Sequence, residues 1–344
     1  MAKVTIDDIT IEVPDGTTIL QAARMIGGDV VPPAMCYYTK LKTSGGYCRS
    51  CLVKVEQGSE RDPRPMPKPV ASCRTTVMDG MVVRNNTSPE ILEARAGVVE
   101  FLLMNHPLDC PVCDQAGECS LQDLGYQHGK AGTRYEFERR EFERIDIGDK
   151  IQLHMNRCIL CYRCVKTADQ LTDGRVHGVI NRGDVAEIST YIQNSIDNDF
   201  SGNMIDVCPV GALTDKTFRF KNRVWYTKPV DAHRDCPTCS GKVRLWYKGE
   251  EVLRVTARKD KYNEVEDWIC NECRFDKKNT TDWVIEGPSH IDRSSVISAN
   301  HYESLKVLKA TIDRQRAALP HGEKVTLGHG ALDPNNAPNQ GGKK

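Results

Sequence analysis

One histidine and three cysteines lie together in a short stretch of the first half of the chain. They are His106, Cys110, Cys113 and Cys119, separated by three, two and five residues. Pro107 disfavours the helical conformation at the preceding residue, so the imidazole is expected in an extended turn that faces the thiolates. We expect a [4Fe–4S] cluster here, whose potential a neutral imidazole ligand would raise. Zinc bound by the same four residues is the alternative.

A second group of cysteines has the spacing that opens a bacterial ferredoxin motif. Its members are Cys158, Cys161, Cys164 and, much later, Cys208, which a proline follows. In that motif, further cysteines bind the second cluster of a pair. Residues without a thiol occupy the places of those second-cluster ligands: Ala168, Asn198, Ser201 and Met204. The pattern predicts one retained [4Fe–4S] cluster and one lost cluster, with four unrelated cysteines as the alternative.

A third group precedes both of these in the chain. It comprises Cys36, Cys48, Cys51 and Cys73, separated by eleven, two and twenty-one residues. Glycines at 45 and 46 let the backbone approach closely and direct N–H groups at the sulfurs of a cluster. These features predict a [2Fe–2S] site. Structural zinc and buried free cysteines are the alternatives.

Two close cysteine pairs come last. They are Cys236 with Cys239 and Cys270 with Cys273, and thirty residues separate the two pairs. Two such pairs that close on one site fit either zinc or an iron–sulfur cluster. The spacing alone leaves both metals open.

The composition excludes several other classes of protein. The chain has 344 residues and 15 cysteines, an odd number arranged in close groups, which is unlike a disulfide framework. The N-terminus has no apolar signal region, and no run of eighteen apolar residues predicts a membrane span. The formal net charge is zero, so bulk electrostatics indicates neither nucleic acid nor an anionic membrane as a partner.

Hydrophobic periodicity predicts the elements that position these groups. A hairpin over residues 3–13 turns at Asp7 and Asp8, and a helix capped by Thr17 or Thr18 then runs to Ile26. The other predicted elements are strands over 52–55 and 81–83, a helix over 88–104, a surface loop over 123–132, a solvated connection over 136–143, a hairpin over 242–255, a helix over 301–319 and a disordered tail over 321–344.

The order of the cysteine groups resembles the iron–sulfur subunit of the peripheral arm of respiratory complex I, NADH:quinone oxidoreductase. This is the G subunit in bacteria and the 75 kDa subunit in mitochondria. Residues 105–114 look like the family's signature for the histidine-ligated cluster, and residues 201–203 and 206–214 look like its segment around the last cluster ligand. The likeness covers roughly residues 1–275. Family members continue into a large domain similar to molybdopterin oxidoreductases, so the chain looks like a truncated form, with no molybdopterin expected.

The resemblance implies an α+β chain of successive modules. They are a β-grasp [2Fe–2S] ferredoxin domain over 1–84, a helical 4Fe–4S module ligated by one His and three Cys over 85–125, a ferredoxin-like [4Fe–4S] domain with one retained cluster over 126–227, a small four-cysteine β segment similar to the start of a molybdopterin-oxidoreductase domain over 228–290, and a helix with a disordered tail over 291–344.

For the four-cysteine segment the resemblance is incomplete. Some bacterial members bind a further [4Fe–4S] cluster there, and Cys236, Cys239 and Cys270 fit the first, second and fourth ligand places of that pattern. The third place is Val243, and Cys273 is additional. The resemblance favours a third [4Fe–4S] cluster, whereas the two-pair spacing favours zinc.

The resemblance also implies a function. The chain would relay electrons from the flavoprotein subunit that oxidises NADH toward the quinone-side subunits, as a peripheral part of a membrane complex on the cytoplasmic side of the bacterial inner membrane. No glycine-rich nucleotide loop or acid–base pair is present, so no substrate site of its own is expected. The alternatives are an electron-transfer subunit of an NAD-linked hydrogenase or formate dehydrogenase, and a zinc-binding interaction protein.

Overall fold

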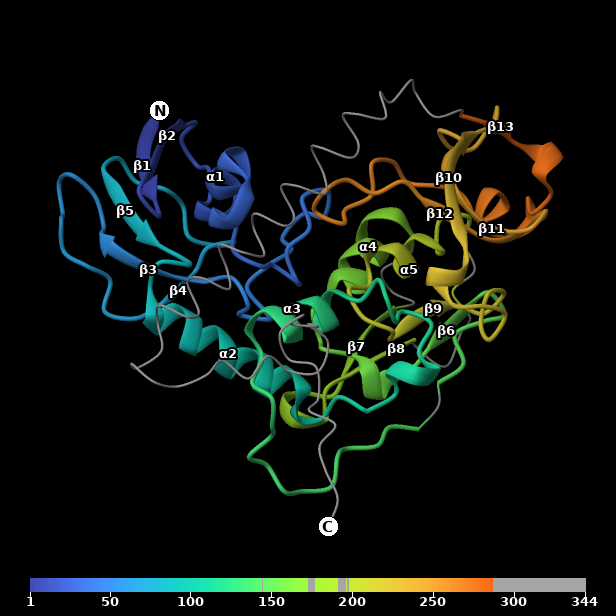
Figure 1. Ribbon diagram of the computed structural model, residues 1–344, viewed down its shortest axis with the longest axis horizontal. Helices are drawn as coiled ribbons and strands as arrows, with labels where there is room; N and C mark the ends of the chain where they lie inside the picture. Colours follow the sequence, from blue (N-terminus) through green and yellow to red (C-terminus); the bar gives the residue numbers. More distant parts are fainter. Residues whose placement is uncertain (144, 173–176, 191–195, 197, 287–344) are drawn as a thin grey trace, which may run out of the picture. The chain divides into compact units, whose positions relative to one another are not determined.

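A computed structural model describes residues 1–143, 145–172, 177–190, 196 and 198–286 of the chain (Figure 1). The residues from Met1 to Glu286 form one compact unit of mixed α/β structure. The helix predicted over 301–319 and the tail predicted after it lie outside the described residues.

The N-terminal residues form a five-stranded mixed sheet. Its strands are β1 (Ala2–Ile6), β2 (Ile9–Val13), β3 (Leu52–Gln57), β4 (Val70–Ala71) and β5 (Met81–Arg84). Their order is β2-β1-β5-β3-β4, in which β1 and β5 run parallel and all other neighbours run antiparallel. The predicted hairpin and both predicted later strands are therefore confirmed.

Helix α1 (Ile19–Ile26) covers this sheet. Thr18 is its N-cap and forms a capping box with Gln21, in which each side chain bonds to the other residue's backbone N–H. Ile19, Ala22 and Ala23 pack with the buried strand residues in one apolar core. The helix ends at Gly27, whose φ of 81° lies in the region that glycine tolerates best.

Two helices follow the sheet. Helix α2 (Pro89–Met104) begins with proline in its first turn, as predicted, and α3 (Ser120–His128) lies beyond the histidine-containing group. The loop predicted over 123–132 is wrong up to residue 128, because residues 123–128 belong to α3. Leu121 and Leu124, three residues apart, bury one face of this helix, and that contact outweighs its polar composition.

The middle of the chain contains two small antiparallel sheets and two helices. The elements are β6 (Ile151–Leu153) paired with β9 (Leu213–Asp215), β7 (His177–Ile180) paired with β8 (Glu187–Thr190), α4 (Arg163–Leu171) and α5 (Asn203–Val207). Short 3₁₀ helices occur at Gly28–Val30, Cys110–Val112, Met155–Arg157, Gly183–Val185, Val224–Tyr226 and Thr280–Asp282.

A four-stranded antiparallel sheet closes the described part of the chain. Its strands are β10 (Lys228–His233), β11 (Lys242–Lys248), β12 (Glu251–Ala257) and β13 (Val284–Ile285), in the order β12-β11-β10-β13. The predicted hairpin over 242–255 is confirmed as β11 and β12, with Gly249 at a positive φ of 62° in its turn. A short π-helix spans Glu272–Asp276.

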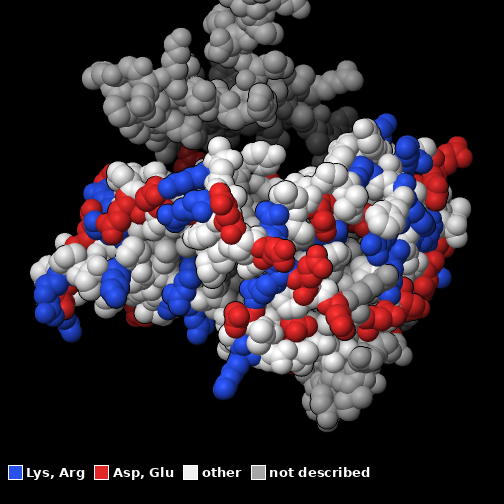
Figure 2. Space-filling view, turned by 90° about the horizontal axis from the view of Figure 1, so that it is seen from below, with Lys and Arg blue, Asp and Glu red and all other residues white. Residues whose placement is uncertain are grey.

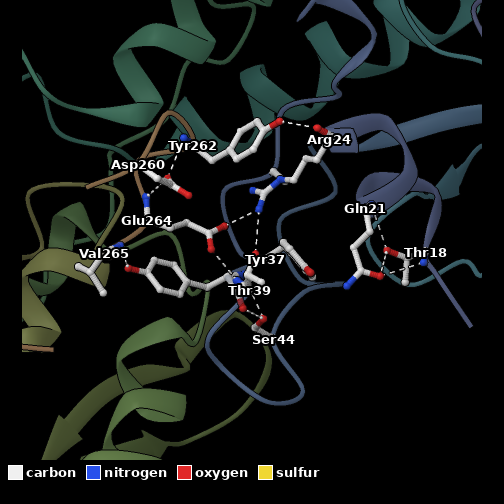
Figure 3. Close-up of polar contacts among 12 residues, drawn as sticks. Thr18, Gln21, Arg24, Tyr37, Thr39, Ser44, Asp260, Tyr262, Glu264 and Val265 are labelled. Atoms are coloured by element: carbon white, nitrogen blue, oxygen red, sulfur yellow. Dashed lines mark hydrogen bonds and ion pairs between the residues drawn. The ribbon is translucent and has the colours of Figure 1, made fainter. Parts of the chain in front are cut away.

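A polar network joins this last sheet region to the N-terminal region (Figure 3). Arg24 donates to Glu264 over 2.7 Å, and the second oxygen of the same carboxylate accepts the backbone N–H of Thr39, also over 2.7 Å. The Arg24 guanidinium lies over the ring of Tyr262, whose hydroxyl donates to the backbone oxygen of Arg24. The Tyr38 hydroxyl accepts the N–H of Val265. Segments more than two hundred residues apart in sequence are thus held together by buried charge and hydrogen bonds.

Acidic and basic side chains are interspersed on the face drawn in Figure 2, as the balanced composition predicts. Among the described residues, no helix combines the length and the apolar character needed to cross a lipid bilayer.

Candidate metal centres

Three cysteines of the first group lie in the loop that precedes β3, and the fourth follows β4. Its four members, Cys36, Cys48, Cys51 and Cys73, are all buried. Backbone N–H groups point at their sulfurs: Gly46 donates to Cys73 over 3.2 Å, and Tyr47 donates to Cys36 over 3.3 Å. Gly45 has a φ of 96°, and a Cβ atom there would lie 3.1 Å from the Cys73 sulfur. The loop therefore requires glycine beside the thiols.

The thiols of this group interact strongly with one another. Hydrogen bonds from Cys48, which has the larger effect, and from Cys73 lower the pKa of Cys36 to about 2. A hydrogen bond from Cys73 likewise lowers the pKa of Cys51 to about 7. The same contacts with Cys36 raise the pKa values of Cys48 and Cys73. Negative charge thus gathers on buried sulfurs, an arrangement that a bound cation would stabilise.

The second group follows α2. Of its residues, Cys113 and Cys119 are buried, His106 is partly buried and Cys110 is exposed. Burial, aided by the charge of Arg157, lowers the pKa of His106 to about 4, so its imidazole is neutral at pH 7. Its Nδ1 atom is buried and has no hydrogen-bond partner among the described residues. A neutral, unpartnered imidazole nitrogen has the chemistry of a metal ligand.

Two sulfurs of the second group, those of Cys113 and Cys119, are buried. Burial raises the pKa of Cys119 to about 11 and also raises that of Cys113. Gly211 packs directly against the Cys113 sulfur, since a Cβ atom at residue 211 would lie 2.1 Å from it. Arg157 bonds to Asp109 over 2.9 Å and so orders the loop between the histidine and the first cysteine of the group.

The third group surrounds a small apolar cavity. The cavity is lined by the sulfurs of the group together with Leu153, Ile159, Tyr162, Ile188, Val210, Ala212 and Leu213. Cys161, Cys164 and Cys208 are buried, and Cys158 is partly exposed. Leu160 and Tyr162 have positive φ values of 50° and 61°, which fold the loop tightly around the sulfurs. Burial raises the pKa of all four thiols, that of Cys161 to about 12.

The four residues at the ligand positions of a second ferredoxin cluster pack or form hydrogen bonds within the protein. Ala168 and Met204 are fully buried in the same apolar cluster as Cys164 and Cys208. Asn198 and Ser201 bond instead to Asn271, whose side chain donates to the Asn198 carbonyl oxygen over 2.7 Å and to the Ser201 hydroxyl over 3.0 Å.

The fourth group, Cys236, Cys239, Cys270 and Cys273, is the most tightly gathered. All four sulfurs lie within 4.8 Å of one another. The Cys236 and Cys270 sulfurs are 3.7 Å apart, as are those of Cys239 and Cys273. Within the described ranges, no other set of three or more His, Cys, Asp or Glu side chains brings its ligand atoms this close together.

The first three groups are linked through shared packing and hydrogen bonds. One apolar cluster contains Cys36 and Cys48 of the first group, Cys119 of the second, and Cys161, Cys164 and Cys208 of the third. The buried Arg163 lies within the third group and donates to the carbonyl oxygens of Ala34 and Tyr37, which flank Cys36. The rings of Tyr47 and Tyr162 are 4.6 Å apart. On the other side, the Pro209 carbonyl oxygen accepts the N–H of Ser120, next to Cys119.

Sequence patterns did not identify Arg163 or Asn271. From sequence alone, Arg163 would be predicted to be an exposed cation. The spacing of the cysteines gives no information about its hydrogen-bond acceptors, Ala34 and Tyr37, which are more than a hundred residues away. Asn271 lies between the cysteines of the last pair, and its four hydrogen bonds to residues 198–202 exist only in the folded chain.

Three segments of the chain match known domain families in succession. Residues 1–88 match a 2Fe-2S iron-sulfur cluster binding domain. Residues 95–134 match the NADH-ubiquinone oxidoreductase-G iron-sulfur binding region. Residues 148–214 match the ferredoxin-like domain of NADH-quinone oxidoreductase subunit 3. The expected 2Fe–2S and 4Fe–4S types of binding domain are thereby confirmed.

Curated proteins extend these matches along the chain. It is 38% identical to the G subunit of NADH-quinone oxidoreductase from Rickettsia bellii, over 96% of this chain and 46% of that protein. It is 42% identical to the NADH-ubiquinone oxidoreductase 75 kDa subunit of Reclinomonas americana, over 80% of this chain and 38% of that protein. It is 40% identical to the mitochondrial NADH dehydrogenase [ubiquinone] iron-sulfur protein 1 of Solanum tuberosum, over 79% of this chain and 35% of that protein. The chain thus spans less than half the length of these relatives.

A crystal structure of an NAD+-reducing [NiFe]-hydrogenase in the H2-reduced state contains a chain of similar fold. The TM-score is 0.55 at 25% identity, and the match covers 65% of this chain and 91% of the hydrogenase chain. In its three domain matches and its curated relatives, the chain is similar to the iron–sulfur subunits of NADH-quinone oxidoreductase, in agreement with the resemblance stated for its cysteine groups.

Proposed function

We propose that the chain is an iron–sulfur electron-transfer subunit of an NADH:quinone oxidoreductase, which relays electrons from an NADH-oxidising flavoprotein toward quinone. One observation carries this proposal: a single apolar cluster contains sulfurs from three separate cysteine groups. An electron conduit needs redox centres that lie close together in a medium without water. Isolated structural metal sites have no such requirement.

We assign one cluster to each of these groups. A [2Fe–2S] cluster is bound by Cys36, Cys48, Cys51 and Cys73. One [4Fe–4S] cluster is bound by His106, Cys110, Cys113 and Cys119, and a second by Cys158, Cys161, Cys164 and Cys208. When bound, such clusters accept and release single electrons, and the protein holds and shields them and tunes their potentials.

The first group fits a [2Fe–2S] cluster in a β-grasp domain. The five-stranded mixed sheet covered by α1 provides the scaffold, and the glycine-bearing loop directs N–H groups at the sulfurs. These donors stabilise negative charge on sulfur and therefore raise the potential of a bound cluster. The burial of all four cysteines excludes water.

The second group fits a cluster with one imidazole ligand. His106 is neutral at pH 7, and its buried Nδ1 atom lacks a hydrogen-bond partner in the described part of the chain, so it can bind iron without first losing a proton. Cys110 is exposed, and we propose that it turns inward when it ligates.

The third group lies between the other two in the network of contacts. Arg163 and Tyr162 reach the loop of the first group, whereas Pro209 and Gly211 reach the second. The order in space thus differs from the order in sequence. We propose that the centre in the middle of the conduit is the one bound by Cys158, Cys161, Cys164 and Cys208, and that the sister site filled by Ala168 and Met204 has no cluster.

Cluster content tests these assignments directly. The anaerobically purified chain is expected to contain about ten iron atoms in these three sites, with one [2Fe–2S] and two [4Fe–4S] signals in low-temperature electron paramagnetic resonance (EPR). Cys48→Ala should remove only the [2Fe–2S] signal. Loss of a different signal would contradict the assignment. His106→Cys should retain its cluster and lower its potential, because an anionic ligand favours the oxidised state; a retained cluster with an unchanged potential would place His106 outside the ligand set.

The whole complex and its location belong to the proposal as well. We infer a peripheral position on a membrane complex, in contact with flavoprotein and quinone-side subunits. Purification of the tagged chain from its native membranes should recover a complex that oxidises NADH with quinone. A hydrogenase subunit is the second candidate, favoured by the 91% coverage of the hydrogenase chain. Recovery of a hydrogen-oxidising complex without quinone reduction would select that candidate instead.

A further inference from the structure

We propose that Cys236, Cys239, Cys270 and Cys273 bind one tetrahedral zinc ion with a structural role, outside the chain of redox clusters. The separation of the sulfurs carries this inference. Four thiolates around one zinc ion at about 2.3 Å lie about 3.8 Å from one another in a regular tetrahedron. The Cys236 and Cys270 sulfurs are 3.7 Å apart, and so are the Cys239 and Cys273 sulfurs. All four sulfurs lie within 4.8 Å of one another.

A [4Fe–4S] cluster requires a different arrangement. Each of its four thiolates binds a separate iron atom at a corner of the cluster, so the ligand sulfurs surround a body of eight atoms rather than one ion. Among the described residues, no other group of three or more possible ligands is gathered as closely as these four cysteines. Their spacing is the spacing of ligands around one ion.

The protein around the site is built for close approach. Gly241 has a φ of 66°, and a Cβ atom there would lie 2.0 Å from the carbonyl oxygen of Arg234. Its N–H donates to the Cys239 sulfur over 3.4 Å, which closes a tight turn around the first cysteine pair. The side chain of Val243 is fully buried in the apolar core beside the site, at the place where the related four-iron pattern needs a third cysteine.

The charges of the site also suit a single ion. Four thiolates and one Zn²⁺ have a net charge of −2, which requires nearby cations or N–H donors. Arg234 supplies a positive charge next to Cys236 and Cys273, and Glu272 holds it in place over 3.0 Å. Zinc has no redox chemistry, and thiolates select it over harder divalent ions, so the ion would provide cross-linking alone.

The second cysteine pair shows what the cross-link would hold. Asn271, between the two cysteines, accepts the N–H of Gly202 over 2.9 Å and donates to Asn198 and Ser201. Arg274, next to Cys273, pairs with the buried Asp206. A zinc ion that fixes this turn therefore fixes the segment leading into Cys208, where a second ferredoxin cluster would otherwise provide the cross-link.

Metal analysis of the full chain tests the proposal. The protein is produced in a medium that supplies iron and zinc equally and is then purified anaerobically. We expect about one zinc per chain, and zinc-edge X-ray absorption should show four sulfur ligands at about 2.3 Å. Cys273→Ser and Cys239→Ser should each lose the zinc and leave iron and sulfide unchanged. The matched control Cys164→Ser should lose iron and keep the zinc.

Several results would overturn the proposal. These are zinc below a tenth of an equivalent per chain, zinc with oxygen ligands, zinc unaffected by either substitution, a mononuclear iron spectrum, or the loss of about four iron atoms in Cys273→Ser. If both serine variants fail to fold, the absorption spectrum of the unsubstituted protein decides, since it needs no variant. Cluster signals from the other three groups are counted in the same samples, so failure of this inference is distinguishable from failure of the proposed function.

Discussion

The third and fourth cysteine groups each contain four cysteines, and both include cysteines separated by two residues, yet the surroundings of the two groups differ. The sulfurs of the third group line an apolar cavity, and burial raises the pKa of every one of its thiols. The fourth group is less enclosed, with Cys236 and Cys239 partly exposed, and its sulfurs nearly touch. Ligand count and spacing therefore do not select a metal by themselves. We infer that the scaffold also selects it, through how closely it gathers the sulfurs and through the medium around them.

Removal of one buried ligand should separate the two regions most strongly. Cys164→Ala is expected to lose about four iron atoms and to lower the free energy of unfolding by on the order of 5 kcal/mol or more, because metal binding energy is folding energy. Metal analysis and thermal unfolding measure both effects. Cys273→Ala is the matched variant in the other region. Equal loss of iron from the two variants would remove the distinction between them.

Arg163 tests whether hydrogen bonds also support the third group. Its guanidinium donates to the backbone carbonyl oxygens of Ala34, Tyr37 and Val207. Arg163→Met would leave buried carbonyl groups without donors, at a cost of roughly 4 kcal/mol, and should broaden the EPR signals of the two centres it joins. Chemical denaturation measures the cost. Lys166→Met on the same helix should change stability by less than about 0.5 kcal/mol, and a similar loss in both variants would contradict the special role of Arg163.

Glu264 provides the corresponding test near the fourth group. Its carboxylate is almost fully buried and bonds to both Arg24 and Thr39 (Figure 3). Glu264→Gln should destabilise the chain by roughly 3 kcal/mol, since it leaves the Arg24 guanidinium buried without its counter-charge. The exposed neighbour Glu266, changed to Gln, is the control. Zinc and iron content should stay unchanged in both variants; loss of either metal from Glu264→Gln would mean that the network acts on the sites themselves.

Acid should affect the third region through His177. This histidine lies on β7, which packs against α4, and burial lowers its pKa to about 4. The unfolded chain, with a pKa near 6.5, binds a proton first, so stability is full above pH 6.5 and falls by about 3 kcal/mol as the pH drops to 4. His177→Leu should abolish this part of the pH dependence in urea titrations. An unchanged slope between pH 6.5 and 4 would show that other groups cause the acid sensitivity.

The sequence predicted local structure where local signals were strong. The Thr18 cap, the turn at Asp7 and Asp8, and the hairpin around Gly249 were all confirmed. Helix α3 was missed because Gly125 and its polar residues read as a loop, and only the burial of Leu121 and Leu124 reveals the helix. The spacing grouped the cysteines but could not give the distance between their sulfurs. That distance depends on long-range contacts such as those of Asn271 with residues 198–202, which no sequence pattern encodes.

The network around Arg24 and Glu264 can form only after most of the chain has been synthesised. Its partners are 240 residues apart, and Thr39 and Tyr38, which follow Cys36 closely, take part in it. During synthesis at about 5–20 residues per second, the N-terminal sheet therefore waits roughly ten to fifty seconds for the segment that covers its cysteine loop. Until residues 264 and 265 are made, Thr39 and Tyr38 lack these partners. The contacts that hold the chain just after Cys36 therefore form late in synthesis, well after the strands of the N-terminal sheet have been made.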